Sequence, residues 1–206
     1  MKSKRRCAEI ALLLAVAATL LWGTWSLEEQ DCLERKMIRL HVIANSDTQE
    51  DQALKLRVRD AVLVSATEIL SAASDMTEAK EQLHDALEGI EQTARETICA
   101  AGYDYDVSAR LERAEFPVKN YDGFALPSGE YLALRLVIGE GAGQNWWCVV
   151  FPPLCMAAAT ELDEVAIAGG FEEEDLALIT EETAGYVLKF RSLELWESLR
   201  QWLGKA

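Results

Sequence analysis

A change in hydrophobic period at Gly102 constrains the fold of this 206-residue chain more than any other feature. Before Gly102, apolar residues recur every three or four positions over residues 54–101, which is the spacing of helices with one buried face. After it, apolar and polar residues alternate over residues 103–112, as in a strand with one solvated face. We therefore expect a single α+β domain over residues 37–206, preceded by a linker over residues 28–36.

A first strand is predicted over residues 37–44, which are apolar or β-branched except for Arg39 and His41 at alternating positions. Because alternate side chains of a strand share one face, Arg39 and His41 are expected on the same side of the sheet. We expect that side to be solvated or only partly covered.

Two helices are predicted between this strand and Gly102. Ser46 with Gln49 has the spacing of a capping box and predicts the start of the first helix. Asp75 with Glu78 has the same spacing and begins a second helix that ends at Gly102, a residue that tolerates positive φ. The short connection predicts an αα-hairpin after the first strand.

The second half of the chain predicts further strands. Residues 131–138 are apolar on both faces except for Arg135, and residues 146–151 form a continuous apolar run, so both indicate buried strands. The glycine-rich loop over residues 139–145 between them is interpreted as a hairpin turn, because it leads into a strand and contains Glu140, unlike a phosphate-binding loop. A mixed or antiparallel sheet is expected.

Residues 156–185 lack Lys, Arg and His and are rich in carboxylates. This composition predicts a peripheral acidic segment that contributes little to the core. Strand-forming residues follow at 186–190, and Ser192 is expected to cap a C-terminal helix.

The N-terminus predicts export. Lys2, Lys4, Arg5 and Arg6 precede an uncharged, mostly apolar run over residues 10–27. Residues 1–27 are therefore interpreted as a signal peptide, or as an uncleaved signal anchor, since the run approaches the length needed to span a bilayer. Contact with the membrane is expected only through this segment.

The charge of the chain argues against nucleic acid as a partner. The formal net charge is −15, and without residues 1–26 there remain 16 basic and 34 acidic residues, which gives 16 − 34 = −18. Nucleic-acid affinity comes chiefly from Lys and Arg that displace counterions. Such a surface would repel a phosphate backbone.

Little in the sequence indicates catalysis, a metal or a cofactor. With only two histidines and no ligand motif such as CxxC or HExxH, no metal site is predicted. His41 and Cys148 could form a catalytic pair only with an activated thiolate, but Cys148 lies in an apolar run that would raise its pKa and leave it inert. We expect a protein without enzymatic activity and without a cofactor.

Export makes a disulfide possible between Cys148 and Cys155, because Phe151-Pro152-Pro153 between them could turn the chain back. Two free buried thiols are the alternative. The sequence does not decide between them.

Large apolar side chains near these cysteines are candidate contact residues. Trp146 and Trp147 are adjacent and must point to opposite faces of a strand, so one can enter the core while the other meets solvent or a partner. The alternative is that both rings are buried. Pro152 and Pro153, in the turn close by in sequence, are further candidate contact residues.

A likeness to a known family is carried by residues 38–47, 51–55, 58–62, 116–117, 121, 127–131 and 145–155. In their order along the chain, these stretches resemble the stage II sporulation protein R family. The resemblance implies an export signal and a non-enzymatic signalling protein that is made in the forespore and exported into the space between the two sporulating compartments. There it would activate a membrane-embedded aspartic protease of the mother cell, which processes the precursor of the mother-cell sigma factor.

Polar residues between Asn45 and Asp60 allow two interpretations. Arg57, Arg59 and Asp60 are candidate contact residues, but they could equally belong to a charge network that holds the first helix. A structural role as a cap is favoured for the three residues that end the stretch 38–47, and two residues on the first turn of the helix belong to the same structural signature. These structural candidates are Asn45, Ser46, Asp47, Asp51 and Gln52.

Two rival functions remain open at this point. One is an exported cysteine or carboxylate hydrolase acting on peptide or cell-wall material. The other is a wall-binding module that uses an exposed Trp146 or Trp147.

Overall fold

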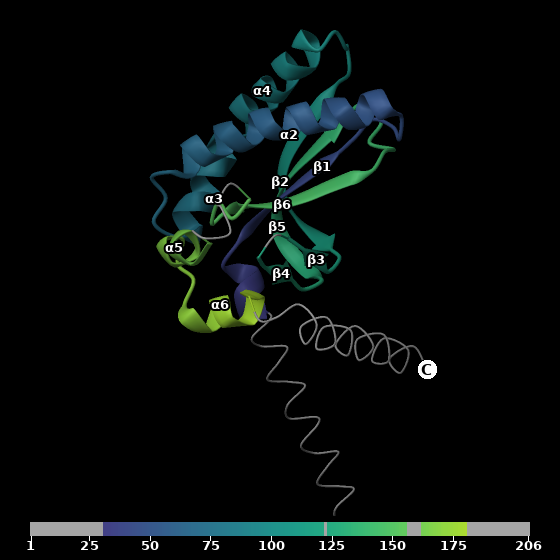
Figure 1. Cartoon of the computed structure of the whole chain (residues 1–206). Coiled ribbons are helices and arrows are strands. Elements are labelled where there is room, and N and C mark those ends of the chain that lie inside the picture. Colours follow the sequence, from purple (N-terminus) through teal and green to yellow (C-terminus); the bar gives the residue numbers. More distant parts are fainter. Residues whose placement is uncertain (1–30, 122, 156–161, 181–206) are drawn as a thin grey trace, which may run out of the picture.

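The computed structural model describes residues 31–121, 123–155 and 162–180 (Figure 1). The predicted export segment, the strand predicted at 186–190 and the C-terminal helix predicted from Ser192 lie outside these residues.

Four strands form one mixed sheet in the order β2-β5-β1-β6. They are β1 (Ile38–Ile43), β2 (Val107–Phe116), β5 (Gly129–Ile138) and β6 (Asn145–Phe151). β1 runs parallel to β5 and antiparallel to β6, while β2 runs antiparallel to β5. The predicted α+β class and mixed sheet are confirmed.

Three helices follow β1 and cover one face of the sheet: α2 (Gln49–Leu70), α3 (Met76–Asp85) and α4 (Leu87–Ala100). α4 packs along α2, so the αα-hairpin is confirmed (Figure 1). Burying each large aliphatic side chain in this layer contributes about 1.5–3 kcal/mol. The buried cluster includes Leu40, Val42, Val58, Val62, Leu83, Ile90, Ile98, Leu134, Leu136 and Val150.

The second predicted helix has the expected ends but is divided in the middle. The Asp75 side chain caps α3, and Gly102 ends α4 with φ +86° while its N–H donates to Cys99 O. At Ala86 the backbone departs from helical geometry, with φ −92° and ψ 0°, which separates α3 from α4. Gly89 lies in the first turn of α4, and glycine lowers the helical preference of that region.

The opposite face of the sheet carries a second, smaller core. β3 (Lys119–Asn120), β4 (Ala125–Leu126), α5 (Leu162–Ala168) and α6 (Glu173–Thr180) lie away from α4, in the lower part of the view (Figure 1). The buried side chains here include Leu33, Met37, Phe116, Leu126, Tyr131, Ala133, Val149, Leu162, Phe171 and Ile179.

This second core corrects two expectations. The described part of the acidic segment does contribute to the core, because Leu162 and Phe171 are buried in it. The expectation was wrong because it rested on the many carboxylates of the segment and not on the apolar residues between them. Residues 31–35, expected in a linker, are helical, and Leu33 is fully buried in the same cluster. The Lys36 ammonium lies 2.6 Å from a carboxylate oxygen of Asp175 in α6, which joins the two segments.

The glycine loop between β5 and β6 is not a hairpin turn, so that prediction was wrong. β1 lies between these two strands, and the loop passes over the end of β1. A Cβ at Gly143 would collide with the backbone carbonyl of Ser46, and one at Gly139 with the Asn45 side chain. The glycines are therefore needed for close approach to the turn after β1.

Candidate interaction surface

The turn between β1 and α2 is organised around the buried carboxylate of Asp51. Asp51 is 4% exposed and accepts hydrogen bonds from Asn45 Nδ2 at 2.8 Å and Ser46 Oγ at 2.6 Å. The hydrogen bond from Ser46, with a smaller contribution from Asn45, holds the pKa of the Asp51 carboxyl below its ordinary value despite burial. The carboxylate is therefore ionised at neutral pH, and its hydrogen bonds hold the turn together.

The N-cap of α2 is Thr48 and not Ser46, so the predicted capping box was wrong. The Thr48 side chain accepts from the Asp51 backbone N–H at 3.3 Å. Ser46 instead donates to the Asp51 side chain, because its hydroxyl lies on the inner side of the turn. Several short polar residues in a row offer competing caps, and spacing alone does not choose among them.

Two further residues of α2 tie this turn to the glycine loop. Gln52 Nε2 donates to Ser46 O at 2.9 Å, and Lys55 Nζ donates to Gln52 Oε1 at 2.6 Å and to Gln144 O at 2.9 Å. Burial lowers the pKa of the Lys55 ammonium, and the negative charge of the exposed Asp47 partly offsets that effect. The structure thus places Asn45, Ser46, Asp51 and Gln52 in one network, whereas Asp47 acts on it only through charge.

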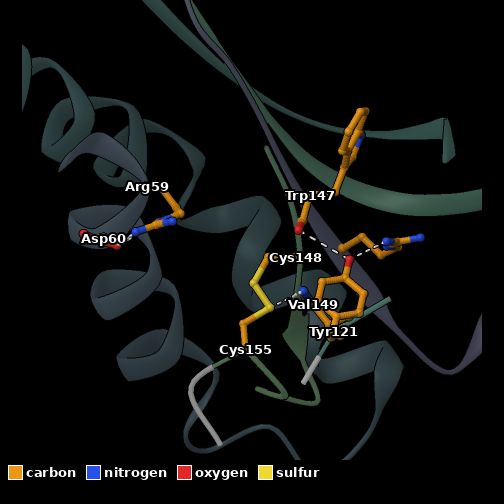
Figure 2. The surroundings of a disulfide bond; sticks show 8 residues. Arg59, Asp60, Tyr121, Trp147, Cys148, Val149 and Cys155 are labelled. Carbon is orange, nitrogen blue, oxygen red and sulfur yellow. Dashed lines mark hydrogen bonds and ion pairs between the residues drawn. A yellow bond between two sulfur atoms is a disulfide. The ribbon is translucent and has the colours of Figure 1, made fainter. Parts of the chain in front are cut away.

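Candidate contact residues from two distant segments meet on the helical face of the sheet. The Arg59 guanidinium of α2 lies 4.1 Å from the ring centroid of Trp146 in β6. Arg59 Nη2 is also 2.6 Å from Asp60 Oδ1, a pair visible in Figure 2. Trp146 remains 37% exposed. We call Trp146, Arg59 and Asp60 the Trp146 surface; Arg57 is exposed elsewhere on α2.

Trp147 lies on the opposite face of the sheet, as alternation predicts. Its ring stacks on His41 with centroids 5.8 Å apart, and the Lys119 ammonium lies 4.1 Å from its centroid. The Trp147 carbonyl accepts a hydrogen bond from Tyr121 Oη at 3.3 Å (Figure 2). Trp147 is half-buried, so neither tryptophan is a core residue.

Arg39, expected on a solvated or partly covered face, is fully buried. Its guanidinium lies 4.1 Å from the Phe116 ring centroid and 4.8 Å from that of Tyr131, and Nη2 donates to Tyr121 Oη at 2.7 Å. Aromatic faces attract a desolvated cation, which offsets part of the cost of burying it. Sequence reasoning missed this cluster because its aromatic members come from different segments.

The two prolines lie at the other end of β6 and serve packing. Pro152 is buried, follows a cis peptide bond, and lies against Gly169, where a Cβ would collide with its ring. Pro153 is half-buried and lines a hollow with Leu70 and Phe151. Pro152 and Pro153 are therefore not part of the Trp146 surface.

Cys148 and Cys155 are joined by a disulfide, with Cα atoms 6.0 Å apart (Figure 2). The Val149 N–H also donates to Cys155 Sγ at 2.8 Å, so the bond closes the turn after β6. Cys148 pairs with Leu40 and belongs to the helical face, while His41 points to the opposite face and stacks on Trp147. His41 and Cys148 therefore do not form a catalytic pair.

The described residues contain no cluster of three or more His, Cys, Asp or Glu side chains placed to hold a metal ion. No helix within the same ranges has both the length and the apolar content of a membrane span.

Comparison with known proteins identifies the family. The family model for stage II sporulation protein R matches residues 34–161, more than half of the chain. The chain belongs to the stage II sporulation protein R family. The match begins before β1 and extends past Cys155, so the described sheet, the hairpin and the disulfide lie within it.

A curated relative supports this assignment. The stage II sporulation protein R of Bacillus subtilis (strain 168) is 40% identical over 118 residues, which cover 57% of this chain and 53% of the relative. The chain thus aligns with about half the length of the curated relative it matches. No solved structure matches. Membership in this family supports a role in sporulation.

Proposed function

We propose that this protein is an exported, non-enzymatic signal of sporulation that activates a membrane-embedded aspartic protease. The protease lies in the mother-cell membrane and processes the precursor of the mother-cell sigma factor. The domain acts in the space between forespore and mother cell, to which residues 1–27 direct it. Family membership and the basic and apolar pattern of that segment support the proposal.

Activation proceeds by docking, without cleavage of a covalent bond by this chain. The domain binds the protease in its active state more tightly than in its inactive state and so shifts the population toward the active one. The nucleophile and base that the sequence suggested are not paired, because Cys148 is in a disulfide and His41 lies on the other face of the sheet.

The observation that carries the docking proposal is the stack of Arg59 on the partly exposed Trp146. Tryptophan and arginine are enriched among the residues that dominate binding energy at interfaces. Asp60 holds the guanidinium in place at 2.6 Å, which reduces the entropy lost when a partner binds. Leu56 on α2 is also 37% exposed, and adds apolar area three residues from Arg59.

The test is reconstitution of the protein with the membrane protease and its pro-sigma substrate. We expect wild-type protein to stimulate cleavage, and Trp146→Ala to raise the concentration required by about tenfold or more, the effect of losing a central interface residue. Arg59→Ala should act in the same direction.

Arg95→Ala is the matched control for Arg59→Ala, because Arg95 is an exposed helical arginine paired with Glu91 at 3.0 Å. It should leave stimulation unchanged. Melting temperatures measured on the same samples separate lost contact from lost folding. Absence of stimulation by the wild type would contradict the proposal, and so would binding of the wild type to purified wall polymer that Trp146→Ala abolishes.

A further inference from the structure

A row of basic and aromatic side chains crosses all four strands on the sheet face opposite α2. Arg110 of β2 is directly opposite Arg135 of β5, Arg135 is paired with His41 of β1, and His41 with Trp147 of β6. Because paired residues on neighbouring strands project from the same face, these four side chains stand side by side. We call them the Arg110 row.

The row lies on the part of this face that the second core leaves open. Arg39, one alternation step from His41 along β1, is fully buried beneath the second core. Arg110 is exposed, and the Arg135 side chain is 37% exposed. A hollow of about 190 Å³ lies between the two arginines, lined also by Ser108 and Val137, which form the next cross-strand pair.

The pairing of Arg110 with Arg135 lowers the stability of the domain when no ligand is bound. Like charges directly opposite one another on adjacent strands destabilise a sheet. Arg135 is partly compensated, since its Nη1 lies 2.8 Å from Glu112 Oε1. Within the described residues, Arg110 makes no ion pair or side-chain hydrogen bond, and Arg135 Nε is buried without a partner. A buried donor without a protein partner is satisfied by water or by a ligand, and the hollow beside Arg135 has room for one.

The charge pattern indicates the chemistry of that ligand. Two guanidinium groups concentrate positive charge on one face of a chain whose net charge is −15. Burial lowers the pKa of the His41 imidazole below its ordinary value, so the positive charge of the row comes from the two arginines. A guanidinium group can donate two parallel hydrogen bonds to one carboxylate. Trp147 and Val137 beside the arginines offer apolar contact. Mixed carboxylate and apolar contacts suit a peptide.

Range of interaction distinguishes a peptide from a lipid surface. An anionic membrane presents an extended plane of charge, which would face the strongly acidic domain as a whole and repel it. A peptide presents a few carboxylates, and screening over about 8 Å at physiological salt restricts their interaction to the nearby arginines. The local patch therefore favours a protein segment.

We propose that the Arg110 row is a docking site for an acidic peptide segment of a protein partner. Carboxylates of the segment bind Arg110 and Arg135 across the hollow, and an apolar side chain packs against Trp147. This site is separate from the Trp146 surface, which lies on the other face of the sheet, and it does not rest on the proposed activation of a protease.

The test measures fluorescence anisotropy of a labelled peptide in which Asp and Glu alternate with Leu, added to the full chain. Its counterpart with Asn and Gln serves as the neutral probe. We expect the acidic peptide to bind and the neutral peptide to bind at least about tenfold more weakly, with binding reduced as salt rises. Arg110→Gln and Arg135→Gln should each weaken acidic-peptide binding about tenfold, as for one lost charged hydrogen bond.

Arg113→Gln is the matched control, because Arg113 lies on the same strand but points to the other face and pairs with Glu130 at 3.6 Å. It should bind the acidic peptide as wild type does. Arg110→Gln should also melt at the same or a higher temperature, since it removes like-charge repulsion; this variant alone decides the test if Arg135→Gln fails to fold.

Three results would overturn the proposal. They are equal binding of acidic and neutral peptides, equal weakening by Arg113→Gln and Arg110→Gln, and arginine-dependent binding to phosphatidylglycerol vesicles without peptide binding.

Discussion

Replacing Asp51 with Asn isolates the contribution of one buried charge to the turn that positions α2. The carboxylate accepts hydrogen bonds from Asn45 at 2.8 Å and Ser46 at 2.6 Å, and it sits in the first turn of the helix. An Asn amide keeps the shape and one accepting oxygen but removes the charge. The variant therefore tests charge rather than packing.

The expected loss follows from these contacts. A hydrogen bond to a charged group contributes about 1 kcal/mol more than a neutral one, and Asp51 accepts two from side chains. The negative charge near the helix N-terminus adds about 0.5 kcal/mol. Asp51→Asn should then destabilise the protein by about 2–3 kcal/mol at neutral pH, which corresponds to a melting temperature lower by about 5–10 °C.

The pH dependence gives a second readout. The pKa of the Asp51 carboxyl lies below its ordinary value of 3.8 in the folded protein. The stability contributed by the ionised form is therefore present above about pH 4 and is lost as the pH falls through the folded-state pKa. The difference in unfolding free energy between wild type and Asp51→Asn should shrink over that range.

The assay is urea denaturation of the purified protein followed by tryptophan fluorescence, at neutral and at acid pH. Asp47→Asn is the matched control, because Asp47 is an exposed carboxylate in the same turn, and it should change stability by less than about 0.5 kcal/mol. A loss of similar size for both variants, or a loss for Asp51→Asn that stays constant on acidification, would refute the reasoning.

Two further predictions concern backbone approach and the disulfide. Gly143→Ala should lower the free energy of unfolding by about 2–3 kcal/mol in a urea titration, because the new Cβ meets the Ser46 carbonyl. Gly89→Ala, on the open surface of α4, should raise it by about 0.5–1 kcal/mol. Comparable effects of the two variants would contradict the close-approach argument. Cys148→Ala and Cys155→Ala should each lose about 2–3 kcal/mol, the value for closing a loop with a separation of 7 residues. A much larger loss for one alone would point to a role of that residue beyond the bond.

Local pattern was enough to predict α2, the outer ends of the α3 and α4 stretch, and the strands of the main sheet. The shift of period at Gly102 marks the end of α4, and the alternating positions of β1 and β6 place Trp146 and Trp147 on opposite faces. These features depend on the repeat of the backbone, which is 3.6 residues in a helix and 2 in a strand. Spacing within one segment therefore suffices to predict them.

Pairing between segments was decided only by the tertiary structure. The insertion of β1 between β5 and β6 turned a predicted hairpin into a loop that crosses a strand end. Burial of Arg39 needs rings from β2 and β5, and the Arg59 stack needs α2 beside β6. Strand order depends on how all apolar faces are buried together, so no single stretch of sequence carries that information.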